Sequence, residues 1–285
     1  MQYDVVARKA GDGLQLLLRR IASLVGGVGV IAALVSLATF VTGWWVFKGS
    51  AGWWVIGGLV CAVPPAAANF KENVVSSKLA DGVWMLGGGS HNSVAVEMKD
   101  HAIVIEGPLY DARAALVVAE TKKLIPNKPI RYVINTHVHF DHSGGLRAAV
   151  AEGLTVVTLK GNGAFFQEAM SRPHTIVPDA LAKAPKPLKL EVIEKDTELK
   201  DAAMTVNLFT IDGSSHSDTM LMAYFPKDRL LVEADVYSPA AAVHPFAANL
   251  LENVTKRKLK VDRIVPIHGG VVPFGDLVKV VAPAN

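Results

Sequence analysis

Three histidines and one aspartate lie within six consecutive residues, His137-Val138-His139-Phe140-Asp141-His142. The segment before them, residues 130–135, is apolar and predicts a β-strand. Alternate side chains of an extended segment point to the same side, so we expect His137 and His139 to face one point. A turn would bring Asp141 and His142 round to a second point. Imidazole and carboxylate groups are common zinc ligands, so the pattern predicts a metal site after a strand.

This motif resembles the His-x-His-x-Asp-His signature of the metallo-beta-lactamase superfamily, which also follows a strand. The similarity runs from about Lys78 to the C-terminus. Family members also have a histidine between two strands, an aspartate after a strand, and a histidine before a glycine near the C-terminus. His216, Asp235 and His268 match these three positions, so all seven ligand positions of the family are filled.

The resemblance implies two bound cations, which we expect to be Zn²⁺, with Fe or Mn as alternatives. Two cations about 3.5–4 Å apart can share a water and lower its pKa to near 7. The resulting bridging hydroxide would be the nucleophile, oriented by Asp141. The ligands implied are His137, His139 and His216 for one cation, Asp141, His142 and His268 for the other, and Asp235 between them.

The function that this resemblance implies is zinc-dependent hydrolysis of a small carbonyl substrate, which is an ester, lactone, thioester or amide. Cys61 is the only cysteine and lies outside the similar region, which excludes the β-lactamase subclass with a cysteine ligand. Asp235 favours the glyoxalase II, lactonase and esterase-like side of the superfamily. Three alternatives stay open: a β-lactamase-like activity, a persulfide dioxygenase with one iron on His137, His216 and Asp235, and a non-catalytic metal-binding membrane protein.

Three further side chains are candidates for contact with a substrate. His91 lies in the glycine-rich segment 87–92, which in the family often overhangs the site, although a flexible turn explains the composition equally well. Tyr237 and His244 follow Asp235 closely enough to line a pocket, and Tyr237 could donate a hydrogen bond to an oxyanion. Surface or packing roles are at least as consistent with the positions of these two residues.

Charge divides the 285-residue chain into two unlike regions. Residues 1–68 contain five basic and two acidic side chains, so the whole net charge of +3 lies there and residues 69–285 are neutral. A neutral domain lacks the positive field with which proteins attract nucleic acid, so we expect a small-molecule substrate and no nucleic acid. We predict a membrane-anchor segment at 1–68 and a hydrolase domain at 69–285, and the sequence does not predict the oligomeric state.

The N-terminal region of the chain is hydrophobic enough to enter a membrane. Residues 21–47 contain no charged side chain, and about 20 apolar residues suffice for a spanning helix. A second uncharged run follows Lys48, and pairs of tryptophans flank this break, as at a membrane interface. The pattern predicts a transmembrane helical hairpin, with helices at about 21–47 and 52–68, in contact with membrane lipid.

Topology is predicted from the basic residues. Four of them precede the first helix, so the positive-inside rule keeps the N-terminus in the cytoplasm, and two spans would return the catalytic domain there. The second run has only about 11 strongly apolar residues, at 53–63, before Pro64 and Pro65, and three alanines follow. An anchor that is cleaved or does not span twice, with a periplasmic domain, is therefore the alternative.

From about residue 69, strand-like and helical segments alternate, as in sheets that are covered by helices. The family fold is an αββα sandwich of the α/β (α+β) class, here preceded by the hairpin. We predict a helix at 111–124, with Asp111 as its N-cap, and a loop over the four prolines of 172–189. The other predicted helices are 146–151 and 247–258, and the strands are 94–98, 102–105, 130–135, 155–159, 190–193, 204–210, 220–225, 230–232 and 263–266.

Overall fold

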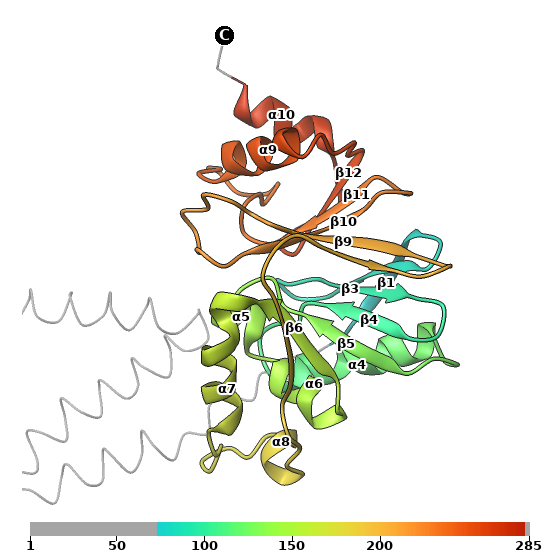
Figure 1. Cartoon of the computed structure of the whole chain (residues 1–285), viewed down its shortest axis with the longest axis vertical. Helices are drawn as coiled ribbons and strands as arrows, with labels where there is room; N and C mark the ends of the chain where they lie inside the picture. Colours follow the sequence, from blue (N-terminus) through green and yellow to red (C-terminus); the bar gives the residue numbers. More distant parts are fainter. Residues whose placement is uncertain (1–72, 283–285) are drawn as a thin grey trace, which may run out of the picture. The chain divides into compact units, whose positions relative to one another are not determined.

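The computed structural model describes residues 73–282. Over this range a pair of β-sheets face each other and helices cover their outer faces, which confirms the predicted α/β sandwich (Figure 1). The predicted membrane hairpin, residues 1–68, lies outside the described residues. Within residues 73–282, every helix is too short or too polar to cross a membrane.

The first sheet has seven strands in chain order: β1 (Val75–Ala80), β2 (Val83–Gly87), β3 (Ser93–Glu97), β4 (Ala102–Ile105), β5 (Ile130–Ile134), β6 (Thr155–Leu159) and β7 (Lys189–Ile193). Strands β1 to β4 pair antiparallel, and β4 to β7 pair parallel. Parallel neighbours need crossover connections. Helix α4 (Asp111–Leu124) joins β4 to β5, and α6 (Leu146–Glu152) joins β5 to β6, so β4 and β5 end at the same edge.

The second sheet has six strands in the order β13-β12-β11-β10-β9-β8. Its strands are β8 (Thr197–Lys200), β9 (Thr205–Thr210), β10 (Leu221–Phe225), β11 (Leu230–Glu233), β12 (Arg263–Pro266) and β13 (Val272–Pro273). Only β11 and β12 pair parallel, and α9 (Ala247–Lys256) forms their crossover. Helix α10 (Phe274–Val281) packs beside α9 on the outer face of this sheet (Figure 1).

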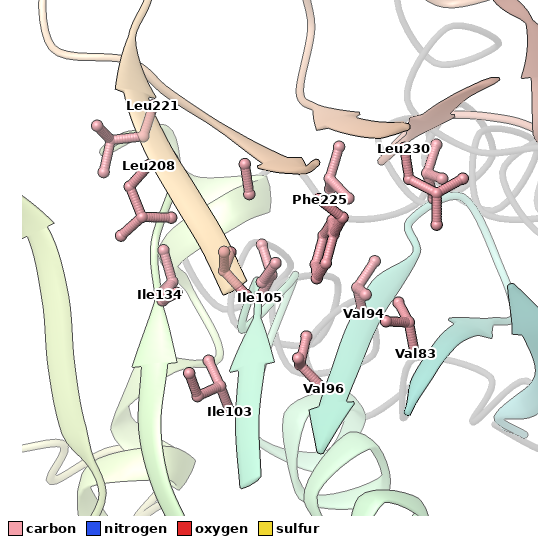
Figure 2. Close-up of a cluster of buried hydrophobic side chains, with 14 of the residues drawn as sticks. Val83, Val94, Val96, Ile103, Ile105, Ile134, Leu208, Leu221, Phe225 and Leu230 are labelled. Atoms are coloured by element: carbon pink, nitrogen blue, oxygen red, sulfur yellow. The ribbon is translucent and has the colours of Figure 1, made fainter. Parts of the chain in front are cut away.

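The alternation of side chains explains why the central strands are apolar throughout. Val94 and Val96 of β3 point into the space between the sheets, whereas Ala95 packs under α4 and α6. In Figure 2, Phe225 and Leu230 of the second sheet meet the inner face of the first. Both faces of these strands are buried, so both sets of alternating positions must be hydrophobic.

Helix α4 has the predicted bounds but a different N-cap. The N-cap residue is Tyr110, whose backbone is extended and whose side chain makes no capping hydrogen bond. Asp111, which we predicted as the cap, is already helical and lies in the first turn. In the first turn, one position after the N-cap, the negative charge of Asp111 interacts favourably with the helix dipole and so stabilises the helix.

The proline-rich segment 172–189 is not a loop throughout, because it contains the short helix α8 (Ala180–Lys183). The carboxylate of Asp179 accepts a hydrogen bond from the backbone N–H of Ala182 and so caps this helix. The other predicted elements agree with the structure to within two residues at each end. The structure adds elements that the patterns did not predict: β1, β2, β8, β13, α5 (Phe140–Ser143), η1 (Lys160–Asn162), α7 (Gly163–Ser171) and α10.

Candidate metal centre

The seven predicted ligands lie in segments that follow strands or join them. His137 and His139 follow β5, while Asp141 and His142 lie on α5 directly after these two histidines. The remaining three come from the second sheet: His216 from the β9–β10 connection, Asp235 after β11 and His268 after β12. Ligand groups at the carboxyl ends of neighbouring parallel strands share one edge of each sheet, so the fold brings these distant segments together.

The first cluster consists of His137, His139, His216 and Asp235, whose candidate ligand atoms all lie within 4.8 Å of one another. Asp235 Oδ2 is 3.3 Å from His137 Nε2 and 2.9 Å from His216 Nε2. Both nitrogens are buried and have no hydrogen-bond partner. Buried polar atoms are normally satisfied, so unpartnered nitrogens that face a carboxylate fit a cation between them.

The second cluster contains the other three predicted ligands, Asp141, His142 and His268, and also His91. Nε2 of His142 is 3.3 Å from Nε2 of His268 and 3.5 Å from Asp141 Oδ2. His91, which we predicted only as a substrate contact, is 5% exposed and places its Nε2 3.3 Å from the same Asp141 oxygen. Nitrogen and oxygen atoms thus converge at a second point.

Asp235 connects the two clusters. Its Oδ1 is 2.7 Å from His268 Nε2, and its Oδ2 is 3.1 Å from His142 Nε2, in addition to the contacts with the first cluster. Burial by itself would raise the pKa of Asp235, but contacts with His137, His142 and His268 hold it well below its usual range. The carboxylate is therefore ionised and lies where a ligand shared by two cations would lie.

Backbone geometry at Asp235 is unusual, because its φ of 64° is in the left-handed region. Such conformations are costly for residues other than glycine and are concentrated at functional sites. Glu233, two residues earlier, is fully buried, and its Oε2 accepts hydrogen bonds from the backbone N–H groups of Val236 and Tyr237. Burial raises the pKa of Glu233 to about 8. These hydrogen bonds hold the turn that presents Asp235.

Glu106 is a functional residue that the motif did not reveal. Its Oε2 accepts a 2.6 Å hydrogen bond from His142 Nδ1, and its Oε1 accepts one of 2.7 Å from the Thr136 N–H. Burial opposes a charge on His142, but the negative charges of Glu106 and Asp235 outweigh it and raise the pKa of His142 to about 10. A partner on the second ring nitrogen orients a metal-binding histidine, so Glu106 directs His142 Nε2 into the site. A glutamate directly after the apolar segment 102–105 was the signal available in the sequence.

Asn92 fixes the β2–β3 connection to the segment that carries His268. Its side-chain Nδ2 donates hydrogen bonds to Pro266 O at 2.9 Å and Gly269 O at 2.7 Å. Its backbone N–H donates to Ile267 O at 2.8 Å. Three hydrogen bonds on both sides of His268 therefore hold these two segments in register.

The other two predicted substrate contacts lie outside both clusters. Tyr237 is 3% exposed and belongs to the apolar cluster under α9. The ring of His244 lies 5.3 Å from that of Tyr237. A different ring, that of Phe246, lies 5.2 Å from His216 at the first cluster. The contact of Tyr237 and His244 with a substrate therefore stays a prediction.

The donor set of the site consists of imidazole nitrogens and carboxylate oxygens, which suit divalent metal ions. His137 and His142 are fully buried, whereas His139 is exposed and the side chain of Asp141 is 41% exposed. The centre thus combines a buried base of ligands with a side that solvent reaches, and a small molecule could approach from that side.

Comparison with known proteins agrees with this geometry. The model of the metallo-beta-lactamase superfamily matches residues 86–268, a range that includes every residue of both clusters. No curated protein matches the chain.

Similar solved structures are metallo-beta-lactamases. FIM-1 from Pseudomonas aeruginosa, in its mono-zinc form, is 19% identical, with a TM-score of 0.56, over 72% of this chain and 92% of that one. The enzyme from Hirschia baltica is 19% identical, with a TM-score of 0.55, over 73% and 96%. DIM-1 is 16% identical, with a TM-score of 0.57, over 73% and 95%. Identities this low show a common fold, and the family match over more than half of the sequence shows that the chain belongs to the metallo-beta-lactamase superfamily.

Proposed function

We propose that this chain is a hydrolase that uses two zinc ions to act on a small carbonyl substrate, such as an ester, lactone, thioester or amide. The observation that carries the proposal is the position of Asp235, whose carboxylate oxygens contact histidines of both clusters. Two separate sets of ligands that share one carboxylate are typical of two-metal hydrolytic sites.

The residues have distinct roles in this proposal. Bound cations would supply Lewis acidity and a water activated for attack on the carbonyl carbon. Asp235 would hold the two positions at a fixed separation, because it is 11% exposed and its oxygens diverge toward different histidines. Asp141 is more accessible, so its carboxylate can orient the attacking water or the substrate at the open side of the site.

Alternatives in the same fold make different demands on the ligands. A persulfide dioxygenase with one iron would need only His137, His216 and Asp235, and it would leave the second cluster without a metal to bind. The similar solved structures are described as metallo-beta-lactamases, so β-lactams belong among the substrates to be tried. Residues 1–68 are proposed to anchor the domain to a membrane, on its cytoplasmic side.

The test is metal analysis and a substrate panel on the purified full-length chain. We expect about two zinc ions per chain and turnover of at least one ester, lactone, thioester, amide or β-lactam. His137→Ala should lose both metal and turnover. His174→Ala is the matched control, because this histidine lies outside both clusters and pairs with Asp179. Two zinc ions without turnover of any substrate would contradict the hydrolase, and one iron with oxygen consumption on glutathione persulfide would establish the dioxygenase.

A further inference from the structure

His91 has the position of a metal ligand rather than of a substrate contact. We propose that His91 is an additional ligand of the second cation, beside Asp141, His142 and His268. The assignment rests on the two-cation centre proposed above and extends it. The candidate ligand atoms of these four side chains lie within 4.8 Å of one another, and the ring of His91 is 4.1 Å from the ring of His268.

In His91, as in the predicted ligands His137 and His142, one ring nitrogen has an oxygen partner outside the cluster and the other points into it. Its Nδ1 is 2.8 Å from Ser90 Oγ, the hydroxyl of the preceding residue, and its Nε2 points into the cluster. His137 has the same arrangement, with Nδ1 3.0 Å from Thr136 Oγ1 and Nε2 in the site. His142 also directs Nε2 inward while Nδ1 is bound. An oxygen partner on the outer nitrogen is the usual support of a histidine that binds a metal through the other nitrogen.

The backbone that carries His91 is fixed by a buried charge. Arg113 of α4 is 3% exposed, and its Nη2 donates to His91 O at 3.0 Å and to Leu86 O at 3.3 Å. Asn92 ties the next residue to the segment around His268. This segment is therefore not a flexible turn, and a ligand held on both sides loses little conformational entropy when a metal binds.

The low exposure of His91 favours a role as a metal ligand over a role as a substrate contact. His91 is 5% exposed, whereas Asp141 beside it has a side chain that is 41% exposed. The little surface that remains on the His91 ring offers almost no area to a substrate. Its Nε2 lies 3.3 Å from the Asp141 carboxylate, so a cation bound by Asp141 in this cluster would also lie within reach of His91.

A fourth side chain would make the two cation positions unequal. The second position would have His91, Asp141, His142 and His268 together with the shared Asp235, whereas the first would have three histidines and Asp235. Zinc accepts at most about five ligands at a catalytic site, so a position with five protein ligands is filled, whereas a position with four can still accept a substrate atom. The second cation would thus be retained more tightly, and the substrate carbonyl would bind at the first.

The affinity test uses full-length protein and zinc titration against a competing chelator. We expect His91→Ala to weaken binding of the tighter cation by about 100-fold or more, because loss of even an outer partner of a ligand costs about 10–100-fold. His139→Ala should instead weaken the binding of the other cation, which the first cluster would hold. His174→Ala should leave both affinities unchanged. Equal affinities in the wild type and in His91→Ala would overturn the assignment while leaving the two-cation hydrolase intact.

A spectroscopic test needs no variant and distinguishes a ligand from a hydrogen-bond donor to Asp141. In protein loaded with ¹¹³Cd and labelled with ¹⁵N-histidine, we expect the second cadmium to couple to three Nε2 nitrogens, those of His91, His142 and His268. Coupling to two nitrogens, with the His91 signal unsplit, would overturn the assignment. Wild-type protein that binds no cation would contradict the proposed function itself.

Discussion

Two polar regions of this protein, the network around Arg147 and the candidate metal centre, differ in whether their atoms satisfy one another. Arg147 of α6 is 7% exposed and pairs with Asp179 through Nε and Nη2, while its Nη1 donates to Ala169 O, Met170 O and Arg172 O at 3.1–3.2 Å. In the metal centre, by contrast, Nε2 of His137 and Nε2 of His216 have no hydrogen-bond partner. The Arg147–Asp179 cluster is complete without a ligand, whereas the candidate metal centre has nitrogen and oxygen atoms directed toward the same points.

This contrast distinguishes polar residues that hold the fold together from polar residues that are arranged to bind a ligand. The Arg147 cluster ties α6 to the end of α7 and to the cap of α8, so its role is to hold three segments together. The metal centre instead retains two residues with left-handed backbones, Glu106 with φ 73° and Asp235 with φ 64°. Backbone strain beside buried nitrogens that make no hydrogen bond is typical of a site that is arranged for a ligand.

The largest effect should follow from removal of the shared carboxylate. Asp235→Asn keeps the size of the side chain and a residue type that tolerates positive φ, but it removes the charge that both clusters contact. We expect metal content to fall from about two ions to less than one per chain and hydrolysis to fall by several orders of magnitude. Mass spectrometry of bound metal and the substrate panel measure both. Retention of two ions by Asp235→Asn would contradict the shared-ligand role.

Removal of the charge from the structural pair should affect stability and leave metal binding intact. Breaking a buried ion pair costs about 3–5 kcal/mol, because the remaining charge is uncompensated. We therefore expect the free energy of unfolding of Asp179→Asn, measured in urea at neutral pH, to be lower than that of the wild type by about this amount. Hydrogen bonds from Arg147 hold the pKa of Asp179 below its usual value of 3.8. A depressed pKa stabilises the fold above pH 4, and this contribution is lost as the pH falls through the lower value, so the difference between variant and wild type should shrink below pH 4.

Glu194→Gln is the control for this prediction, because Glu194 pairs with Lys160 on the surface, where both side chains are about two-thirds exposed. We expect little change in its unfolding, since exposed ion pairs contribute little. Loss of metal from Asp179→Asn would show that the two polar clusters are coupled.

A smaller and more selective effect should come from Glu106. In Glu106→Gln the side chain cannot accept from both His142 Nδ1 and the Thr136 N–H, because one oxygen is replaced by an NH₂ donor. We expect one cation, the one held by the second cluster, to bind about 10–100-fold more weakly, with no change at the first. Chelator competition measures both affinities. Glu97→Gln, on the neighbouring strand β3, serves as the control, and equal weakening of both cations would contradict the selective role of Glu106.

Much of the fold could be predicted from local patterns. The bounds of β4, α4, β6 and β12 agree with the strands and the helix predicted at 102–105, 111–124, 155–159 and 263–266. The missed strands β1 and β8 lie at sheet edges and are mostly polar and exposed, so no hydrophobic alternation marks them. Helix α10 has an apolar sequence, FGDLVKVV, that resembles a strand as much as a helix. Periodicity alone does not distinguish a helix from a strand in an apolar run this short.

The candidate site, like the fold, was predicted only where residue type and local spacing were sufficient. The six-residue segment of histidines and aspartate, together with His216, Asp235 and His268, identified the predicted ligands from residue type and order alone. The structure places them in two clusters, because the strands that carry them end at a common edge of each sheet. Glu106 could not be recognised as a partner of His142, because the two are 36 residues apart and meet only through the pairing of β4 with β5.

The sequence by itself determined the ligand chemistry, the superfamily resemblance and the alternation of buried strands, because these depend on residue type and local spacing. Only the tertiary structure decided that His91 lies in the second cluster and that the segment carrying it is not a flexible turn. That outcome depends on Asn92 and Arg113, which fix its backbone through hydrogen bonds to residues up to 177 positions away. Contacts over such a separation arise from the packing of two sheets, and no local pattern contains them.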